Sequence, residues 1–220
     1  MNKAEREIYL KEKLIKMKEY ENQLYTQGYL AVAGTDEVGR GPLAGPVVAA
    51  TVVLPESCDV IGIDDSKKLS PKKREELYYK IKETALSIGV SFVDNDTIDK
   101  INILNATKAA MVQSLNHANQ KLIEGYESEI EYLLSDAVKL DNVKIPQMNI
   151  IKGDEKCISI AAASIIAKVT RDRFMIKMEA RYPGYDFASN KGYGTKNHYA
   201  GIKRMGLTPI HRKTFLKNFI

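Results

Sequence analysis

Four carboxylates in this 220-residue sequence stand at or just beyond the ends of apolar, strand-like runs. Asp36 and Glu37 end the run "YLAVAGTDE". Asp136 ends "EIEYLLSD", and Asp154 ends "QMNIIKGD". Strand ends that lie side by side in a sheet bring residues that are distant in sequence to one place. Carboxylates gathered in this way raise one another's pKa unless cations hold them. The pattern therefore predicts a site for a hard divalent metal ion.

Mg²⁺ suits these ligands because it takes oxygen ligands, keeps several water molecules and often completes its shell with substrate phosphate. Two such ions about 3.5–4 Å apart activate water and stabilise the leaving oxygen in phosphodiester cleavage. Each acid taken alone has an ordinary alternative: Asp36 or Asp154 can cap a turn, and Glu37 can pair with a lysine. The four acids together favour the metal site.

A glycine-rich turn, "VGRGP", directly follows the first two acids. Glycines let main-chain N–H groups approach a ligand closely, and the guanidinium of Arg40 can bind a phosphate through two hydrogen bonds. The alternative is a tight turn with a solvated arginine. Beside a metal site, we expect the turn to hold a polyanion.

The charge balance is consistent with a polyanionic partner. The net charge is +5 and the pI is near 9.0, and lysine and arginine gain affinity by displacing counterions from phosphates. The basic side chains that could follow the backbone of such a partner are Lys67, Lys68, Lys72, Lys73, Lys191, Lys196, Arg204, Arg212 and Lys213. The alternative for each one alone is a solvated surface charge.

Apolar runs and cysteines argue against a membrane or a zinc protein. No run approaches the roughly 18 to 20 apolar residues that a bilayer span requires, and no apolar signal core follows Met1. Cys58 and Cys157 lack the paired spacing of a zinc site, so we expect packing residues. The three histidines also lack metal spacing. The sequence therefore predicts a soluble cytoplasmic protein.

The elements that must position the acids follow from hydrophobic periodicity. Strands are expected at 29–36, 46–54, 87–94, 129–138 and 147–154. Helices are expected at 4–27, 105–120, 159–181 and 196–205, and a further helix is expected to begin after an N-cap at Ser70. This order predicts an α/β fold with a mixed sheet flanked by helices.

Five segments of the sequence, in order, resemble the ribonuclease HII family. They are "AGTDEVGRGPLAGPVVAA", "DDSKKLS", "INILNATKAAM", "IIKGDEKCISIAAASIIAKVTRDR" and "YPGYDFASNKGYGTKNHYAGIKRMGLTPIHRKTF". The resemblance covers 33–215, which is nearly the whole chain outside the N-terminal helix. It implies a ribonuclease H-like fold with a five-stranded mixed sheet. The implied parts are an N-terminal helix (1–27), a catalytic domain (28–182) and a basic helical extension (183–220).

The resemblance also implies roles for individual residues. The family's metal-binding carboxylates correspond to Asp36, Glu37, Asp136 and Asp154. Its glycine-arginine-glycine loop and a tyrosine, which recognise the ribonucleotide 2′-hydroxyl, correspond to Gly39, Arg40, Gly41 and Tyr193. The related ribonuclease HIII typically has lysine in place of Arg40 and a separate N-terminal domain, so type HII is favoured.

We therefore predict a monomeric endoribonuclease that uses Mg²⁺ or Mn²⁺, with two ions in the presence of substrate. Its expected substrates are RNA–DNA hybrids and duplex DNA with embedded ribonucleotides, which it cuts 5′ of the ribonucleotide to leave 3′-hydroxyl and 5′-phosphate ends. One alternative is another metal nuclease of the same fold, such as a junction resolvase or a DNA exonuclease. The other is a hybrid-binding protein without activity, against which the intact set of acids argues.

Overall fold

The computed structural model describes residues 2–141 and 143–217, which are organised around one mixed sheet. Its five strands are β1 (Val32–Val38), β2 (Val47–Val53), β3 (Ser87–Val93), β4 (Tyr132–Asp136) and β5 (Gln147–Ile150). Their order is β3-β2-β1-β4-β5. The pairs β1–β2 and β2–β3 are antiparallel, whereas β1–β4 and β4–β5 are parallel. This confirms the predicted mixed sheet.

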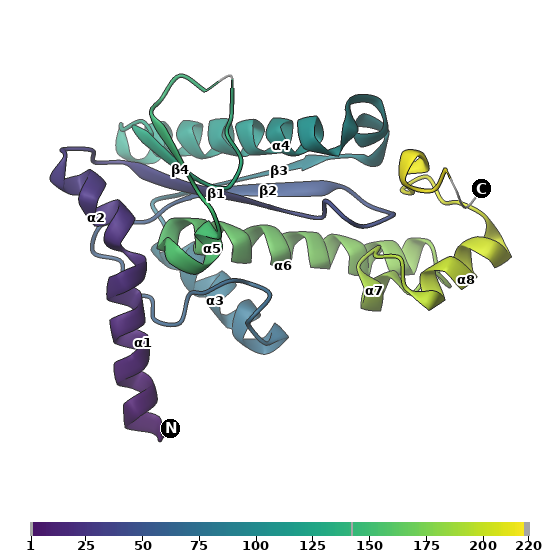
Figure 1. Cartoon of the computed structure of the whole chain (residues 1–220), viewed down its shortest axis with the longest axis horizontal. Helices are drawn as coiled ribbons and strands as arrows, with labels where there is room; N and C mark the ends of the chain where they lie inside the picture. The colour runs from purple at the N-terminus through teal and green to yellow at the C-terminus, as the bar shows by residue number, and fades with distance from the viewer. Residues whose placement is uncertain (1, 142, 218–220) are drawn as a thin grey trace.

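Helices cover both faces of the sheet. Figure 1 shows α4 (Asn95–Tyr126) on one face and α6 (Ile158–Arg181) on the other. All seven residues of β2 are buried, as expected of a strand with both faces covered. The helix α6 lies very close to β1: a Cβ at Gly34 would overlap the backbone of Ser159. The glycine therefore permits the approach of α6 to the sheet.

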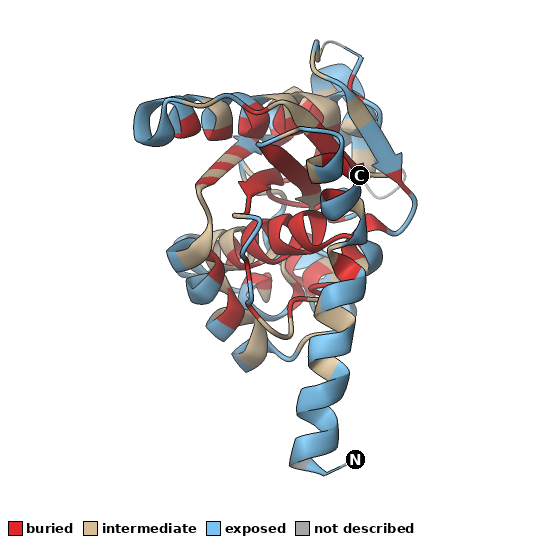
Figure 2. Cartoon of the chain, turned by 90° about the vertical axis from the view of Figure 1, so that its left-hand side faces the viewer, coloured by how far each residue is buried: buried red, intermediate tan, exposed pale blue. Residues whose placement is uncertain are grey.

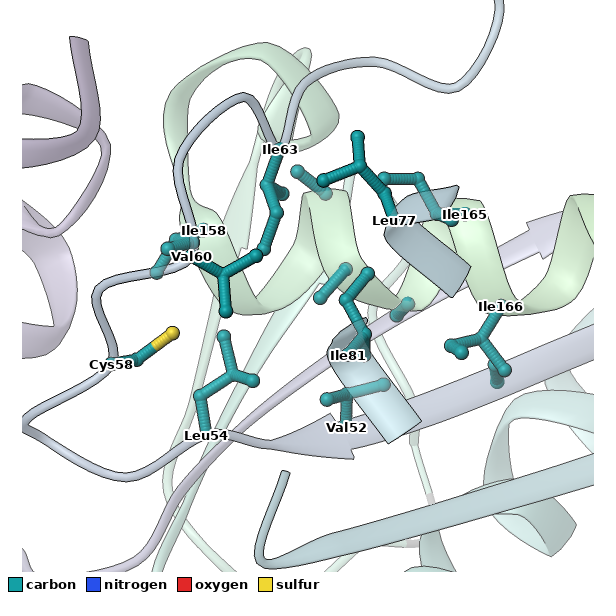
Figure 3. Packing of buried hydrophobic residues seen from close by; sticks show 14 of the residues in the cluster. Val52, Leu54, Cys58, Val60, Ile63, Leu77, Ile81, Ile158, Ile165 and Ile166 are labelled. Carbon is teal, nitrogen blue, oxygen red and sulfur yellow. The ribbon is translucent and has the colours of Figure 1, made fainter. Parts of the chain in front are cut away.

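The helix α3 (Pro71–Thr84) begins as the sequence predicts. The hydroxyl oxygen of Ser70 accepts a hydrogen bond from the N–H of Lys73 (3.3 Å), and Pro71 occupies the first turn. Its apolar side packs on the α6 face of the sheet, where Leu77 and Ile81 join a buried cluster with residues of β2 and α6 (Figure 3).

The N-terminal segment differs from the single helix predicted at 4–27. It forms α1 (Lys3–Met17) and α2 (Glu19–Thr26), which meet at Lys18. The ammonium of Lys18 donates to the carbonyls of Glu56 (2.6 Å) and Cys58 (3.1 Å), which fastens this junction to the body of the protein. Most of α1 extends outward and is exposed (Figures 1 and 2). A break set by distant carbonyls leaves no mark in the local pattern.

The helix α4 is also longer than the predicted 105–120, and it contains a kink at Asn102, whose φ is 66°. Its first turns are stabilised by the C-terminal segment. The Asn95 side chain donates to the carbonyl of Pro209 (2.9 Å), and the Asp99 carboxylate accepts from the N–H of Lys213 (2.8 Å). Such partners lie more than 100 residues away, which is why the sequence did not predict these turns.

The C-terminal region contains α5 (Gly153–Lys156) before α6 and then α7 (Phe187–Asn190), α8 (Lys196–Met205) and the 3₁₀ turn η1 (Lys213–Phe215). The prediction of a helix at 196–205 is confirmed. Phe187, Ile202 and Leu216 share a buried cluster with Leu43 and Ala44, so this region packs against the loop after β1. In the part of the chain that is described, no helix is long and apolar enough to cross a membrane.

Candidate active site

Three of the four predicted acids lie on two neighbouring strands of the sheet. Asp36 and Glu37 lie in β1, and Asp136 is the last residue of β4, the parallel neighbour of β1. The register pairs Thr35 with Ser135, so Asp36 and Asp136 follow at the same level. Because side chains alternate along a strand, Asp36 faces α6 and Glu37 faces the other side. The prediction placed these acids at strand ends, and β1 in fact continues through both.

Asp154 reaches this place by a different route from the predicted strand end. The strand β5 stops at Ile150, and Asp154 lies in the first turn of the short helix α5. A tight turn precedes it, with Lys152 in the left-handed region at φ 58°. The N–H of Gly153 donates to Oδ1 of Asp136 (2.8 Å). This hydrogen bond ties the turn that carries Asp154 to the end of β4.

The four carboxylates share one electrostatic environment. Burial raises the pKa of Asp36 well above its usual range, and the charges of Glu37 and Asp136 raise it further. Burial and Asp136 also raise the pKa of Glu37, although Arg40 opposes the shift. The pKa of Asp154 rises to about 6 through burial and the neighbouring charges of Asp136 and Asp65. A cation in this place would relieve all of these shifts.

The donor set fits a divalent metal ion. One carboxylate oxygen of Glu37, Oε2, is buried and has no hydrogen-bond partner among the described residues. Acids with raised pKa values and a partnerless buried oxygen are the groups that a hard cation would compensate. Within residues 2–141 and 143–217, no three His, Cys, Asp or Glu side chains already surround one point at ligating distance. Carboxylates without a cation repel one another, which opposes such a cage.

Two basic side chains border the acids. Nη1 of Arg40 lies 3.3 Å from Oε1 of Glu37, and Nζ of Lys67 lies 3.8 Å from Oδ2 of Asp154. Both basic side chains are largely exposed. They can therefore turn from these weak ion pairs toward an incoming phosphate.

The structure brings the "GRG" turn and Tyr193 together. Gly39 has a φ of +94°, and the N–H of Leu43 donates to the carbonyl of Gly192 (2.8 Å). A Cβ placed on Gly41 would lie 3.6 Å from the ring of Tyr193. The tyrosine remains 44% exposed, which leaves the ring accessible beside the turn. These residues form one surface. Its first part, the turn, follows Asp36 and Glu37 directly in the chain at the end of β1.

Sequence reasoning assigned no supporting role to four residues beneath this surface. Ser164 of α6 forms a side-chain hydrogen bond with Asp36, and its hydroxyl lies 2.9 Å from that of Ser66. Arg171 and Arg212 are fully buried beneath the turn. All four lie in the segments that resemble the ribonuclease HII family, which is the signal that could have found them. The burial of Arg212 corrects its prediction as a contact to a duplex backbone.

Comparisons with known proteins agree with this geometry. The family model described as Ribonuclease HII matches residues 33–218. A curated Ribonuclease HII from Ruminiclostridium cellulolyticum is 52% identical over 219 residues, which cover 100% of this chain and 82% of that protein.

Two solved structures share the fold. The ribonuclease H2 of Pyrococcus horikoshii superposes with a TM-score of 0.69 at 28% identity, over 84% of this chain and 93% of that one. The RNase HII of Archaeoglobus fulgidus, solved in a complex with PCNA, gives a TM-score of 0.63 at 25% identity, over 83% of this chain and 94% of that one. From the family match and the sheet-borne acids together, the chain belongs to the ribonuclease HII family and is a ribonuclease H, a metal-dependent nuclease that hydrolyses RNA in RNA–DNA hybrids.

Proposed function

We propose that this ribonuclease H also incises duplex DNA on the 5′ side of a single embedded ribonucleotide. The products would carry 3′-hydroxyl and 5′-phosphate ends, and the enzyme would act in ribonucleotide removal during replication and repair. The observation that carries the proposal is the continuity of β1. Asp36 and Glu37 run directly into the "GRG" turn, and the turn contacts the segment of Tyr193. The acids and the turn that we propose to contact the sugar therefore lie on one stretch of main chain.

The proposed metal ligands are Asp36, Glu37, Asp136 and Asp154. Bound Mg²⁺ or Mn²⁺, with two ions in the presence of substrate, would activate water and stabilise the leaving oxygen. The protein contributes rigidity: Asp36 is anchored on the sheet, and Asp136 is held by the N–H of Gly153. No side chain of the protein needs to act as the nucleophile.

The turn and the tyrosine are proposed to recognise the ribonucleotide. The main-chain N–H groups of Gly39, Arg40 and Gly41 can reach the sugar-phosphate backbone because the two glycines have no side chain that would block it. Arg40 would leave Glu37 to bind a phosphate, since its guanidinium is exposed. The exposed ring of Tyr193 would pack against the sugar whose 2′-hydroxyl distinguishes RNA from DNA.

The decisive experiment uses a DNA duplex that contains one ribonucleotide, with cleavage mapped to the nucleotide. We expect a single cut 5′ of the ribonucleotide and no cut in a matched all-DNA duplex. Comparable cleavage of the all-DNA duplex would instead support a DNA nuclease of the same fold. Cleavage of a uniform hybrid without any cut at the single ribonucleotide would reject this proposal and leave the ribonuclease H activity intact.

We also propose that the enzyme acts as a monomer, with functional parts at 1–27, 28–182 and 183–220. Sedimentation of the protein alone and bound to a hybrid tests the first point: we expect the mass of a monomer for the protein alone, and one protein per hybrid in the complex.

A further inference from the structure

Arg212 is fully buried, and in the described part of the chain its guanidinium donates only to main-chain carbonyls of one loop. Nη2 donates to the carbonyl of Gly39 (2.6 Å), and Nη1 donates to that of Arg40 (2.9 Å). Nε and Nη2 donate to the carbonyl of Gly45, at 2.9 and 2.8 Å. The fork therefore joins the beginning and the end of the loop between β1 and β2.

Neighbouring contacts hold Arg212 in place. Its N–H donates to the carbonyl of Leu43 (2.8 Å), and its guanidinium lies 5.1 Å from the ring centre of Phe215. The preceding residue, His211, forms a β-bridge with Ala44. The C-terminal segment thus delivers a rigid guanidinium to the inner side of the loop.

These hydrogen bonds also orient two main-chain N–H groups, because of the geometry of the peptide unit. A trans peptide is planar and points its C=O and N–H in opposite directions, and the described residues contain no cis peptide. The carbonyl of Gly39 shares a peptide with the N–H of Arg40, and the carbonyl of Arg40 shares one with the N–H of Gly41. With both carbonyls held inward, both N–H groups point outward.

These two N–H groups are free to bind a ligand. Within the described ranges, 2–141 and 143–217, no residue accepts a hydrogen bond from the N–H of Arg40 or Gly41. Both residues are exposed. Successive outward N–H groups form a concavity that binds anionic oxygen atoms. The loop thus presents a pair of aligned donors next to Asp36 and Glu37.

A second buried arginine connects this loop to the segment of the tyrosine. Arg171 donates to the carbonyls of Pro46 (2.9 Å), Ala44 (3.1 Å) and Lys191 (2.9 Å). Burial lowers the pKa of Arg171 to about 10, and burial followed by the charge of Arg171 lowers that of Arg212 to about 9. Both stay charged at neutral pH, so two cations lie beneath the outward donors. Burying a cation has a large desolvation cost. A role in orienting the loop would explain why these two arginines are buried nevertheless.

We propose that Arg212 is a positioning residue for the cleavage reaction. Its fork holds the carbonyls of Gly39 and Arg40 inward, so that the N–H groups of Arg40 and Gly41 meet the sugar-phosphate beside the four acids. The inference rests on the proposed function of this loop. Lysine cannot replace the fork, because an ammonium is a compact point charge without the planar set of donors.

The test is Arg212→Lys, measured in single turnover with enzyme in large excess over a duplex that carries one ribonucleotide and over a uniform hybrid. We expect the rate constant at saturation to fall at least about tenfold on both substrates, because misplacement of about 1 Å can cost about a hundredfold in rate. The reaction amplitude and the affinity for the hybrid, measured in EDTA, should stay within about threefold of wild type, because the basic surface is unchanged.

Two control variants isolate this effect. Arg173→Lys makes the same change in an arginine that binds Glu75 and Tyr79, away from the loop. Leu122→Ala destabilises a different buried cluster, on α4. Both should keep the wild-type rate constant at a temperature where they are folded.

Several outcomes overturn the proposal. They are a wild-type rate constant in Arg212→Lys, a loss confined to amplitude, a loss restored by excess enzyme, and unfolding under conditions where Leu122→Ala stays folded. Failure of the wild-type enzyme on the single ribonucleotide is a separate result. It rejects the proposed function, and the uniform hybrid then still tests Arg212.

Discussion

Asp36 and Asp136 are the residues on which the proposed metal site depends most directly. Both lie on the sheet at the same level of neighbouring parallel strands, and the pKa of Asp36 responds to the charge of Asp136. A carboxamide has almost the same shape as a carboxylate but carries no charge. Substitution by asparagine therefore removes the attraction for a cation and leaves the packing intact.

We expect Asp36→Asn and Asp136→Asn each to abolish cleavage of a hybrid in Mg²⁺ and to keep hybrid affinity within about tenfold of wild type. Each change removes a ligand charge, whereas affinity depends mainly on basic side chains. Gel-based cleavage assays and fluorescence anisotropy measure the two quantities. Near wild-type turnover in both variants would exclude the proposed metal site.

At the surface beside these acids, Arg40→Ala and Tyr193→Ala should slow cleavage at a single ribonucleotide more than they weaken duplex binding. If these residues align the sugar with the acids, the loss persists at saturating enzyme and amounts to about a hundredfold. Tyr126→Ala is a matched control, because Tyr126 is a similarly exposed tyrosine at the end of α4. Single-turnover rates decide the matter, and full recovery of both variants at saturation would reject an alignment role.

At the scale of elements, α8 and the segment after it are joined by a chain of hydrogen bonds that ends at Tyr193. Nδ1 of His211 accepts from the N–H of Thr208 (2.8 Å), so its proton lies on Nε2. That proton is donated to Nε2 of His198 (3.0 Å), and Nδ1–H of His198 is donated to the carbonyl of Tyr193 (2.9 Å). Both imidazoles are therefore neutral, and the hydrogen bond from His198 holds the carbonyl of Tyr193 in place.

This chain predicts a pH dependence of stability. Burial, followed by the proximity of His198, lowers the pKa of His211 from 6.5 to about 4. The unfolded state then binds more protons than the folded state between these values. The contribution of neutral His211 to the free energy of unfolding is therefore fully present above pH 6.5 and is lost as the pH falls toward 4, on the order of 1 kcal/mol between pH 7 and pH 5 once solvent screening is allowed for.

The measurement compares urea unfolding of wild type and His211→Asn at several pH values in that window. Asparagine keeps an acceptor near the position of Nδ1 but does not titrate, so the difference between the two curves should shrink as the pH falls. Parallel curves from pH 7 to pH 5 would contradict the neutral histidine pair.

At the scale of the whole molecule, the net charge of +5 and the exposed lysines around the site favour a polyanion. Lys67 and Lys68 flank Asp154 and Glu155, and both lysines are largely exposed. Contacts of such side chains with phosphates release counterions but carry no information about the sugar. Affinity and selectivity should therefore respond differently to salt.

We expect hybrid affinity to fall about a hundredfold between about 50 and 200 mM salt, the value for about four phosphate contacts. The ratio of cleavage rates between ribonucleotide-containing and all-DNA duplexes should change little, because the 2′-hydroxyl contact is local. Anisotropy titrations and parallel cleavage assays provide both numbers. An affinity that is constant over this range would contradict a basic binding surface.

The sequence by itself determined the features that depend on neighbours along the chain. Alternating and continuous apolar runs identified five strands, Ser70 and Pro71 marked the start of α3, and strand-associated acids singled out Asp36, Glu37 and Asp136. These signals are local because strand pattern, helix capping and the position of a polar residue after an apolar run are properties of a few consecutive residues.

Only the tertiary structure decided where the charged side chains go. The break at Lys18 and the early start of α4 depend on carbonyls and a main-chain N–H from distant segments. Arg212 resembles any exposed base in the basic C-terminal sequence, yet it is buried against carbonyls of residues 39–45. The burial of a charge is decided by the partners that folding brings to it, and those partners are more than 160 residues away in sequence.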